Sequence, residues 1–162
     1  MNDIFIRPAT ENDVPQILDF IQQLAEYEKL THVVVATEEL LRDTLFGPHP
    51  AAEVLLAFLS EEEMPVGFAL FFTNYSTFLA RPGLYLEDLF VAPQYRGRGA
   101  GKALLKALAQ LAKERGYGRF EWSCLDWNEP SICFYKSMGA IMMDEWKIFR
   151  VTGEALDKLA QS

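Results

Sequence analysis

The sequence has 162 residues, of which 50% are hydrophobic and 13% aromatic, so it can bury one substantial core. Its formal net charge of −8 argues against nucleic acid or an anionic membrane as a general partner, because those surfaces are bound through Lys and Arg. No apolar run approaches the ~20 residues that a membrane-spanning helix needs, and the N-terminus lacks the pattern of a signal peptide, so we expect a cytoplasmic protein.

The cysteine content gives no sign of a disulfide framework or of a metal site. Cys124 and Cys133 are the two cysteines, and neither has a His or a second Cys at zinc-ligand spacing. No repeat, low-complexity tract or linker-like stretch interrupts the sequence. We therefore predict a single domain over residues 1–162 without a bound metal.

The first half of the chain predicts a strand, two helices and a hairpin. A strand over residues 3–7 precedes the helix start at residues 10–13, after which apolar residues recur at helical spacing. A second helix is predicted from Thr37 to the Gly47-Pro48 pair, which is typical of a helix end. Apolar runs at residues 53–59 and 66–73 flank a polar stretch and indicate a β-hairpin.

The second half alternates strands and helices. A strand is predicted over residues 84–91, a helix over 101–115 and a strand over 117–125. Residues 128–139 predict a short helix, because Asn can cap it, Pro suits its first turn and Gly can end it. Residues 146–151 predict a last strand. The resulting order, β-α-α-β-β-β-α-β-α-β, indicates a mixed α/β fold.

A glycine-rich loop between the strand at 84–91 and the next helix has the form of a diphosphate-binding turn. Glycines let the backbone approach the ligand and adopt positive φ, while a helix N-terminus supplies N–H donors and a positive dipole end. Basic side chains add charge. The residues are Arg96, Gly97, Arg98, Gly99, Ala100, Gly101 and Lys102.

Other nucleotide-binding loops do not match this pattern. A Walker loop needs four residues between Gly and Gly-Lys-Ser/Thr, and a dinucleotide fingerprint opens a βαβ unit with an acidic residue about 20 positions further on. Taken alone, the loop is equally consistent with a glycine-rich helix cap whose arginines are solvated.

Longer motifs resemble those of the GNAT acetyltransferases. They are Leu-Glu-Asp-Leu-Phe-Val at 86–91, R-x-x-G-x-G at 96–101, and Trp-Asn-Glu-Pro-Ser-Ile-Cys-Phe-Tyr-Lys-Ser-Met-Gly-Ala at 127–140. Further segments at 6–10 and 24–28 resemble the branch that contains the diamine (spermidine/spermine) and thialysine acetyltransferases. The resemblance covers nearly the whole chain and implies a mostly antiparallel central sheet flanked by helices, and a homodimer.

The resemblance also implies a cosubstrate, acetyl-CoA, and roles for individual residues. Contacts with acetyl-CoA are implied for the loop residues 96–102 and for Leu89, Phe90, Val91, Asn128 and Tyr135. Tyr135 is implied to face the sulfur atom. The implied amine-binding residues are Glu28, Glu87 and Asp88.

These residues suit acetyl transfer to an amine. An alkyl ammonium with a pKa near ~10.4 must lose a proton before it can attack a thioester, and Glu87 is the candidate base, acting through water. A backbone N–H near Phe90 can polarise the thioester carbonyl. Tyr135 can hydrogen-bond or protonate the departing thiolate.

The acceptor stays open between three alternatives. Polyamine-preferring relatives carry an acidic residue and a Trp where this chain has Tyr75-Ser76-Thr77-Phe78, so the resemblance favours a thialysine-like or lysine-like acceptor. A diamine or polyamine acceptor is the second alternative, and a non-catalytic acyl-CoA-binding domain is the third. We expect the loops at 31–37 and 74–82 to select the acceptor.

Overall fold

The structure is a computed structural model that describes residues 3–162. It forms two compact parts, one that ends at Ser123 and one from Cys124 to Ser162. Each part has its own helices, and all strands lie in the first part.

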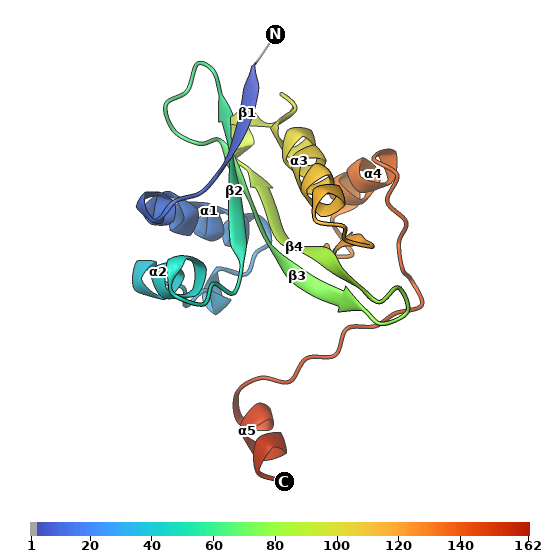
Figure 1. Ribbon diagram of the computed structural model, residues 1–162. Helices are drawn as coiled ribbons and strands as arrows, with labels where there is room; N and C mark the ends of the chain where they lie inside the picture. Colours follow the sequence, from blue (N-terminus) through green and yellow to red (C-terminus); the bar gives the residue numbers. More distant parts are fainter. Residues whose placement is uncertain (1–2) are drawn as a thin grey trace. The chain divides into compact units, whose positions relative to one another are not determined.

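A five-stranded sheet forms the centre of the first part, with its strands in the order β1-β2-β3-β4-β5 (Figure 1). The strands are β1 Ile4–Pro8, β2 Glu53–Leu59, β3 Gly67–Ser76, β4 Arg81–Val91 and β5 Phe120–Trp122. The first four strands pair antiparallel, and β4 pairs with β5 parallel. This arrangement confirms the predicted mixed, mostly antiparallel sheet.

Helices cover both faces of this sheet (Figure 1). On one side lie α1 (Val14–Tyr27) and α2 (Glu38–Phe46), and on the other lies α3 (Ala100–Glu114). Alternate residues of β2, including Leu56 and Phe58, join Ile17 and Phe20 of α1 in one hydrophobic cluster, as the two-residue period of a strand requires. Among residues 3–162, no helix is long and apolar enough to cross a membrane.

The helix boundaries follow the signals in the sequence closely. The hydroxyl of Thr37 accepts a hydrogen bond from the N–H of Leu40 at 3.1 Å and so caps α2. Gly116, with φ of +73°, follows the end of α3. The first helix starts later than predicted, since residues 11–13 form a 3-10 turn in which the Asp13 carboxylate accepts hydrogen bonds from Arg7 and from the backbone of Thr10.

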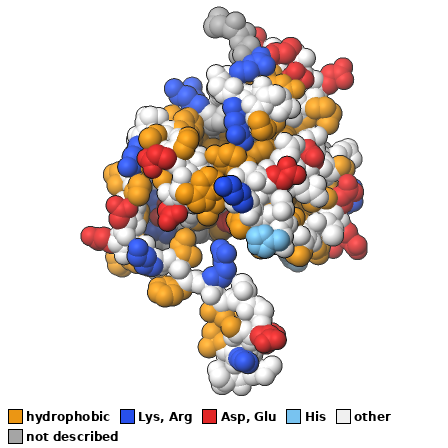
Figure 2. Space-filling model, turned by 180° about the vertical axis from the view of Figure 1, so that it is seen from behind, with side chains coloured by type: hydrophobic (Ala, Val, Ile, Leu, Met, Phe, Trp, Pro, Cys, Tyr) orange, Lys and Arg blue, Asp and Glu red, His pale blue; other side chains and the backbone are white. Residues whose placement is uncertain are grey.

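The second part contains α4 (Glu129–Ser137) and α5 (Gly153–Gln161). Asn128 caps α4 and Gly139, with φ of +93°, follows it, so the predicted short helix is confirmed. Helix α5 follows a cap at Thr152 and was not predicted. Figure 2 shows hydrophobic side chains on the surface of this helix, at the bottom of the view.

The predicted strand at 146–151 is wrong, because this segment has no regular structure. Its side chains are suited to a strand, but a strand exists only when a neighbour takes its backbone hydrogen bonds, and residues 124–162 contain no strand. Several of its hydrophobic side chains are exposed, Trp146 by 73% and Phe149 by 92%.

Two further predictions need correction in the first part. The strand predicted at 117–125 is limited to Phe120–Trp122, where it pairs with Leu84, Tyr85 and Leu86 of β4. The loop predicted at 74–82 is largely strand, because β3 and β4 continue as a ladder to the pair Ser76 and Arg81. That leaves residues 77–80 as the turn.

Candidate active site

The glycine-rich loop lies where the sequence predicted it, between a short 3-10 turn (Pro93–Tyr95) and α3. Gly97 and Gly99 have φ of +76° and +94°, in the left-handed region that favours glycine. Gly99 occupies the N-cap of α3 and offers no side chain to its first turn. The first N–H groups of α3 have no acceptor within the helix, so they can bind an anion.

The basic side chains of the loop have different surroundings. Arg98 forms an ion pair with Glu61 of the β2–β3 loop. Lys102 is exposed in the first turn of α3. The guanidinium of Arg96 lies over the ring of Tyr27, 4.8 Å from its centroid, and its Nε donates a hydrogen bond to the Val91 carbonyl at 2.9 Å. Arg98 and Lys102 therefore fit the predicted role of phosphate charges better than Arg96 does.

Strand β4 contains an irregularity at Glu87. Leu70 of β3 pairs with Asp88, but the next residue, Phe71, pairs with Leu86, so Glu87 is the extra residue of a β-bulge. A bulge reverses the face of all later side chains in the strand. Asp88 thus lies on the same face as Phe90, which is 3% exposed and belongs to the cluster with α1.

Three carboxylates near this bulge, those of Glu28, Glu87 and Asp88, lie within electrostatic reach of one another. Glu28 follows α1 directly as its C-cap residue, and Asp88 faces the same side of the sheet. Burial, with a smaller contribution from the carboxylates of Glu87 and Glu28, raises the pKa of Asp88 to about 7. Burial also raises the pKa of Glu28. Such a cluster is suited to a cation, which would stabilise its charged form.

In the part of the chain that the structure describes, the last residues of β4 lack a strand partner on the side of β5. Strand β5 pairs with Leu84, Tyr85 and Leu86, whereas β4 continues to Val91. Among residues 3–162, no strand pairs with residues 87–91 on that side. Backbone N–H and C=O groups between Leu89 and Val91 that point to this side, apart from the Val91 carbonyl that accepts a hydrogen bond from Arg96, can therefore bind an extended ligand as a neighbouring strand would.

Asn128 and Tyr135 lie on α4, in the second part of the molecule. The Asn128 side chain, 7% exposed, accepts a hydrogen bond from the N–H of Ser131 at 3.4 Å and so caps α4. The Tyr135 ring lies 5.6 Å from that of Phe134. That Tyr135 faces the thioester sulfur, and that Asn128 contacts acetyl-CoA, both stay predictions.

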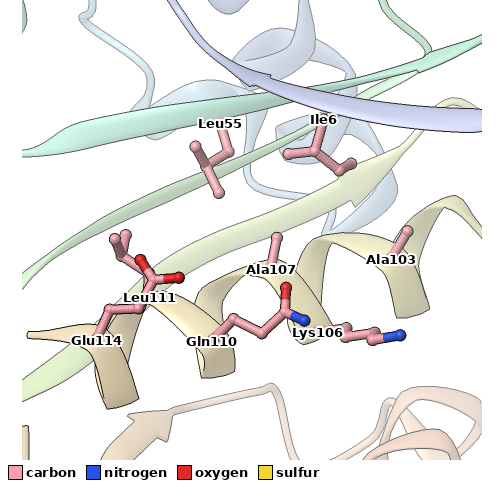
Figure 3. A pocket seen from close by; sticks show the side chains of 8 residues that line it. All are labelled: Ile6, Leu55, Ala103, Lys106, Ala107, Gln110, Leu111 and Glu114. Carbon is pink, nitrogen blue, oxygen red and sulfur yellow. The ribbon is translucent and has the colours of Figure 1, made fainter.

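A groove of about 470 Å³ lies elsewhere, between α3 and the first two strands (Figure 3). Ile6 and Leu55 face a row of α3 side chains that includes Lys106 and Glu114. None of the predicted site residues lines this groove. It is therefore not the candidate active site.

Comparison with known families decides the class of the protein. A family model described as "Acetyltransferase (GNAT) family" matches residues 18–140. The chain belongs to the GNAT acetyltransferases. The match includes the bulge in β4, the glycine-rich loop and α4, so the acetyltransferase activity and the fold that the sequence predicted are confirmed.

Relatives of this GNAT acetyltransferase include enzymes named for amino-acid acceptors. The thialysine N-epsilon-acetyltransferase of Mus musculus is 40% identical, over 96% of each chain. The L-ornithine N5-acetyltransferase of Arabidopsis thaliana is 38% identical, over 95% of this chain and 86% of its own. Among solved structures, an integron cassette protein from the mobile metagenome of V. cholerae is 27% identical, with a TM-score of 0.80 over 98% of each chain.

Two features of this GNAT site were not recognised in the sequence. The bulge had a signal, since Glu87 and Asp88 are two adjacent polar residues inside an otherwise apolar run from Leu84 to Val91. The contact between Arg96 and Tyr27 had none, because the two residues are far apart in the chain and only the fold brings them together.

Proposed function

We propose that the protein transfers the acetyl group of acetyl-CoA to a side-chain primary amine of a small cationic amino acid of the thialysine or lysine type. The observation that carries this proposal is the carboxylate cluster of Glu28, Glu87 and Asp88 at the bulge of β4. The names of the relatives, which refer to thialysine and L-ornithine, support an acceptor of this chemistry.

Acetyl-CoA is proposed to bind along the end of β4 and in the glycine-rich loop. Its extended pantetheine arm would pair with the backbone of Leu89, Phe90 and Val91, which lacks a strand partner on the side of β5. Its diphosphate would accept hydrogen bonds from the first turn of α3, with Arg98 and Lys102 adding charge.

Different carboxylates would bind the ammonium, accept its proton and relay that proton to water. An ammonium with a pKa near ~10.4 needs a base whose own pKa lies near the operating pH, so that a good share of it is ionised and it is still basic. Asp88, with a pKa of about 7, matches this requirement better than an ordinary carboxyl group. Glu87 is exposed and suited to relay the proton through water. Glu28 would contribute charge for binding.

Tyr135 is proposed to hydrogen-bond the sulfur as the thiolate leaves. Taking ordinary pKa values of ~8.5 for a thiol and ~10 for tyrosine, full proton transfer is uphill by about 2 kcal/mol. A hydrogen bond to the developing charge would therefore matter as much as transfer.

Thiol release from acetyl-CoA tests the proposal. The assay compares thialysine, lysine and ornithine with diamines, with spermidine and with peptide amines. We expect the highest kcat/KM for an amino acid with a side-chain amine. A preference for spermidine would establish the polyamine alternative, and acetyl-CoA binding without thiol release across the panel would establish a non-catalytic domain.

We also propose that residues 1–162 act as one domain in a cytoplasmic homodimer. The family model continues across residue 123, which supports a single domain.

The exposed hydrophobic side chains of residues 141–151 support a contact with a second copy. Cys133 is an exposed thiol outside any disulfide, as is typical of a reducing compartment. Cell fractionation tests the location.

A further inference from the structure

We infer that Arg96 is a positioning residue, which ties the entrance of the glycine-rich loop to the end of α1, and that it is not a ligand of the diphosphate. The inference deepens the proposed function, on which it rests. It assigns Arg96, the first arginine of the glycine-rich loop, to the support of the elements that carry the proposed amine-binding carboxylates.

Three contacts carry the inference. The Arg96 guanidinium lies 4.8 Å from the centroid of the Tyr27 ring and 5.4 Å from that of Phe90. Its Nε donates to the carbonyl of Val91, the last residue of β4, at 2.9 Å. A guanidinium over the face of an aromatic ring is attracted by the ring's quadrupole, so these contacts hold the Arg96 side chain between α1 and β4.

The contacted residues adjoin the carboxylate cluster. Tyr27 is the last residue of α1 and immediately precedes Glu28. Phe90 lies two positions after Asp88 in β4, on the same side of the sheet. Arg96 therefore contacts both elements that supply the carboxylates. Without its guanidinium, the last turn of α1 would lose one of its links to the end of β4, while the contact of Phe20 with Phe90 would remain.

The other cations of the loop differ from Arg96. The guanidinium of Arg98 pairs with Glu61, an exposed carboxylate with which a diphosphate can compete. Lys102 is exposed at the first turn of α3. These two side chains are therefore the ones whose charge should determine how strongly salt weakens the binding of CoA.

Titration of the full-length protein with CoA at low and high salt separates the two roles. We expect R96Q to bind CoA within about twofold of the wild type and to keep its salt dependence, whereas R98Q binds more weakly and loses part of that dependence. R42Q, which removes an exposed guanidinium from α2, serves as the charge control. If R96Q loses affinity and salt dependence as R98Q does, Arg96 is a phosphate ligand and the inference is wrong.

A double-mutant cycle tests the link to α1. We expect R96Q and Y27L each to raise the KM for the amine about threefold or more, with little change in the KM for acetyl-CoA. The double variant should show no larger effect than the stronger single variant, because both remove one contact. R96K, which keeps a cation near the ring, should recover part of the loss, and R96M replaces R96Q if that variant does not fold. Effects of Y27L and R96Q that multiply would contradict the inference.

The outcomes separate this inference from the proposed function. Wild-type protein that releases no thiol with any amine would overturn the proposed function. The CoA titrations would still decide whether Arg96 binds phosphate, and the same cycle measured on the midpoint of urea unfolding would decide whether it is coupled to Tyr27.

Discussion

Asp88 pairs with Leu70 across the β3–β4 ladder, but the residue after Leu70 pairs with Leu86, and the skipped Glu87 turns Asp88 toward α1. Because of this one extra residue, adjacent carboxylates have different surroundings. Glu87 is exposed, whereas Asp88 is partly buried and has a raised pKa. The two side chains are thus not interchangeable, and substitutions at each should have different effects.

The raised pKa of Asp88 should make the protein less stable as pH rises. Its pKa in the unfolded chain is near ~3.9, so between about pH 4 and pH 7 the folded state holds the proton that the unfolded state loses. The free energy of unfolding should therefore fall across this window. D88N removes the effect and should flatten the fall by up to about 1.4 kcal/mol per pH unit, as measured by urea unfolding at pH 5 and pH 7.

E87Q is the matched control for this prediction. Burial is the main cause of the shift and Glu87 a lesser one, so E87Q should flatten the fall only slightly. The pKa assignment would be wrong if D88N retained the full pH dependence of the wild type.

A pair of glycine substitutions should separate the shape of the loop from its contact with the ligand. Gly99 has φ of +94°, and a Cβ there would lie 3.3 Å from Cδ1 of Ile4. G99A should therefore destabilise the fold by about 1–2 kcal/mol. Gly101 has ordinary φ, and its Cβ would lie 3.8 Å from Cγ2 of Val91, a normal contact.

G101A should thus fold as stably as the wild type while weakening CoA binding, because its methyl group would stand where the backbone approaches the diphosphate. Thermal unfolding and CoA titration measure the two effects. Unchanged CoA affinity in stable G101A would remove Gly101 from the binding site.

Tyr135→Phe should lose most of its turnover while binding acetyl-CoA as the wild type does. The substitution removes the hydroxyl that is proposed to bond the leaving thiolate but keeps the ring, which contacts Phe134. Steady-state thiol release and acetyl-CoA titration measure the two quantities. An unchanged kcat would exclude Tyr135 from the mechanism.

Replacing Trp146 and Phe149 together by Ser should shift a homodimer toward monomers. Both side chains are highly exposed, so the folded chain itself should lose little stability. Light scattering over a range of concentrations gives the oligomeric state. A double variant that stays as dimeric as the wild type would place the contact elsewhere.

The sequence predicted the local elements well because their signals are local. Thr37 and Gly47 mark the ends of α2, and the glycines at 97 and 99 have the positive φ that their pattern suggested. The candidate site on β4 was predicted through the family resemblance, since Glu87-Asp88 alone could equally have been a solvated strand end.

What the sequence could not predict depends on pairing across long separations. The segment at 146–151 has strand-like side chains without a strand partner in its own part of the molecule. The ladder continues β3 from Asn74 to Ser76, through residues that were predicted as loop, because β4 supplies the hydrogen bonds. The contact of Arg96 with Tyr27 likewise exists only in the folded chain.

The half-paired end of β4 also has a consequence for handling the protein. A strand edge with free backbone groups is a template for unwanted pairing with other chains, and residues 87–91 offer such an edge on the side of β5. A ligand that pairs with this backbone would shield it. Acetyl-CoA or CoA in the purification buffer should therefore suppress aggregation, and its removal by dialysis should be the step at which concentrated protein begins to precipitate.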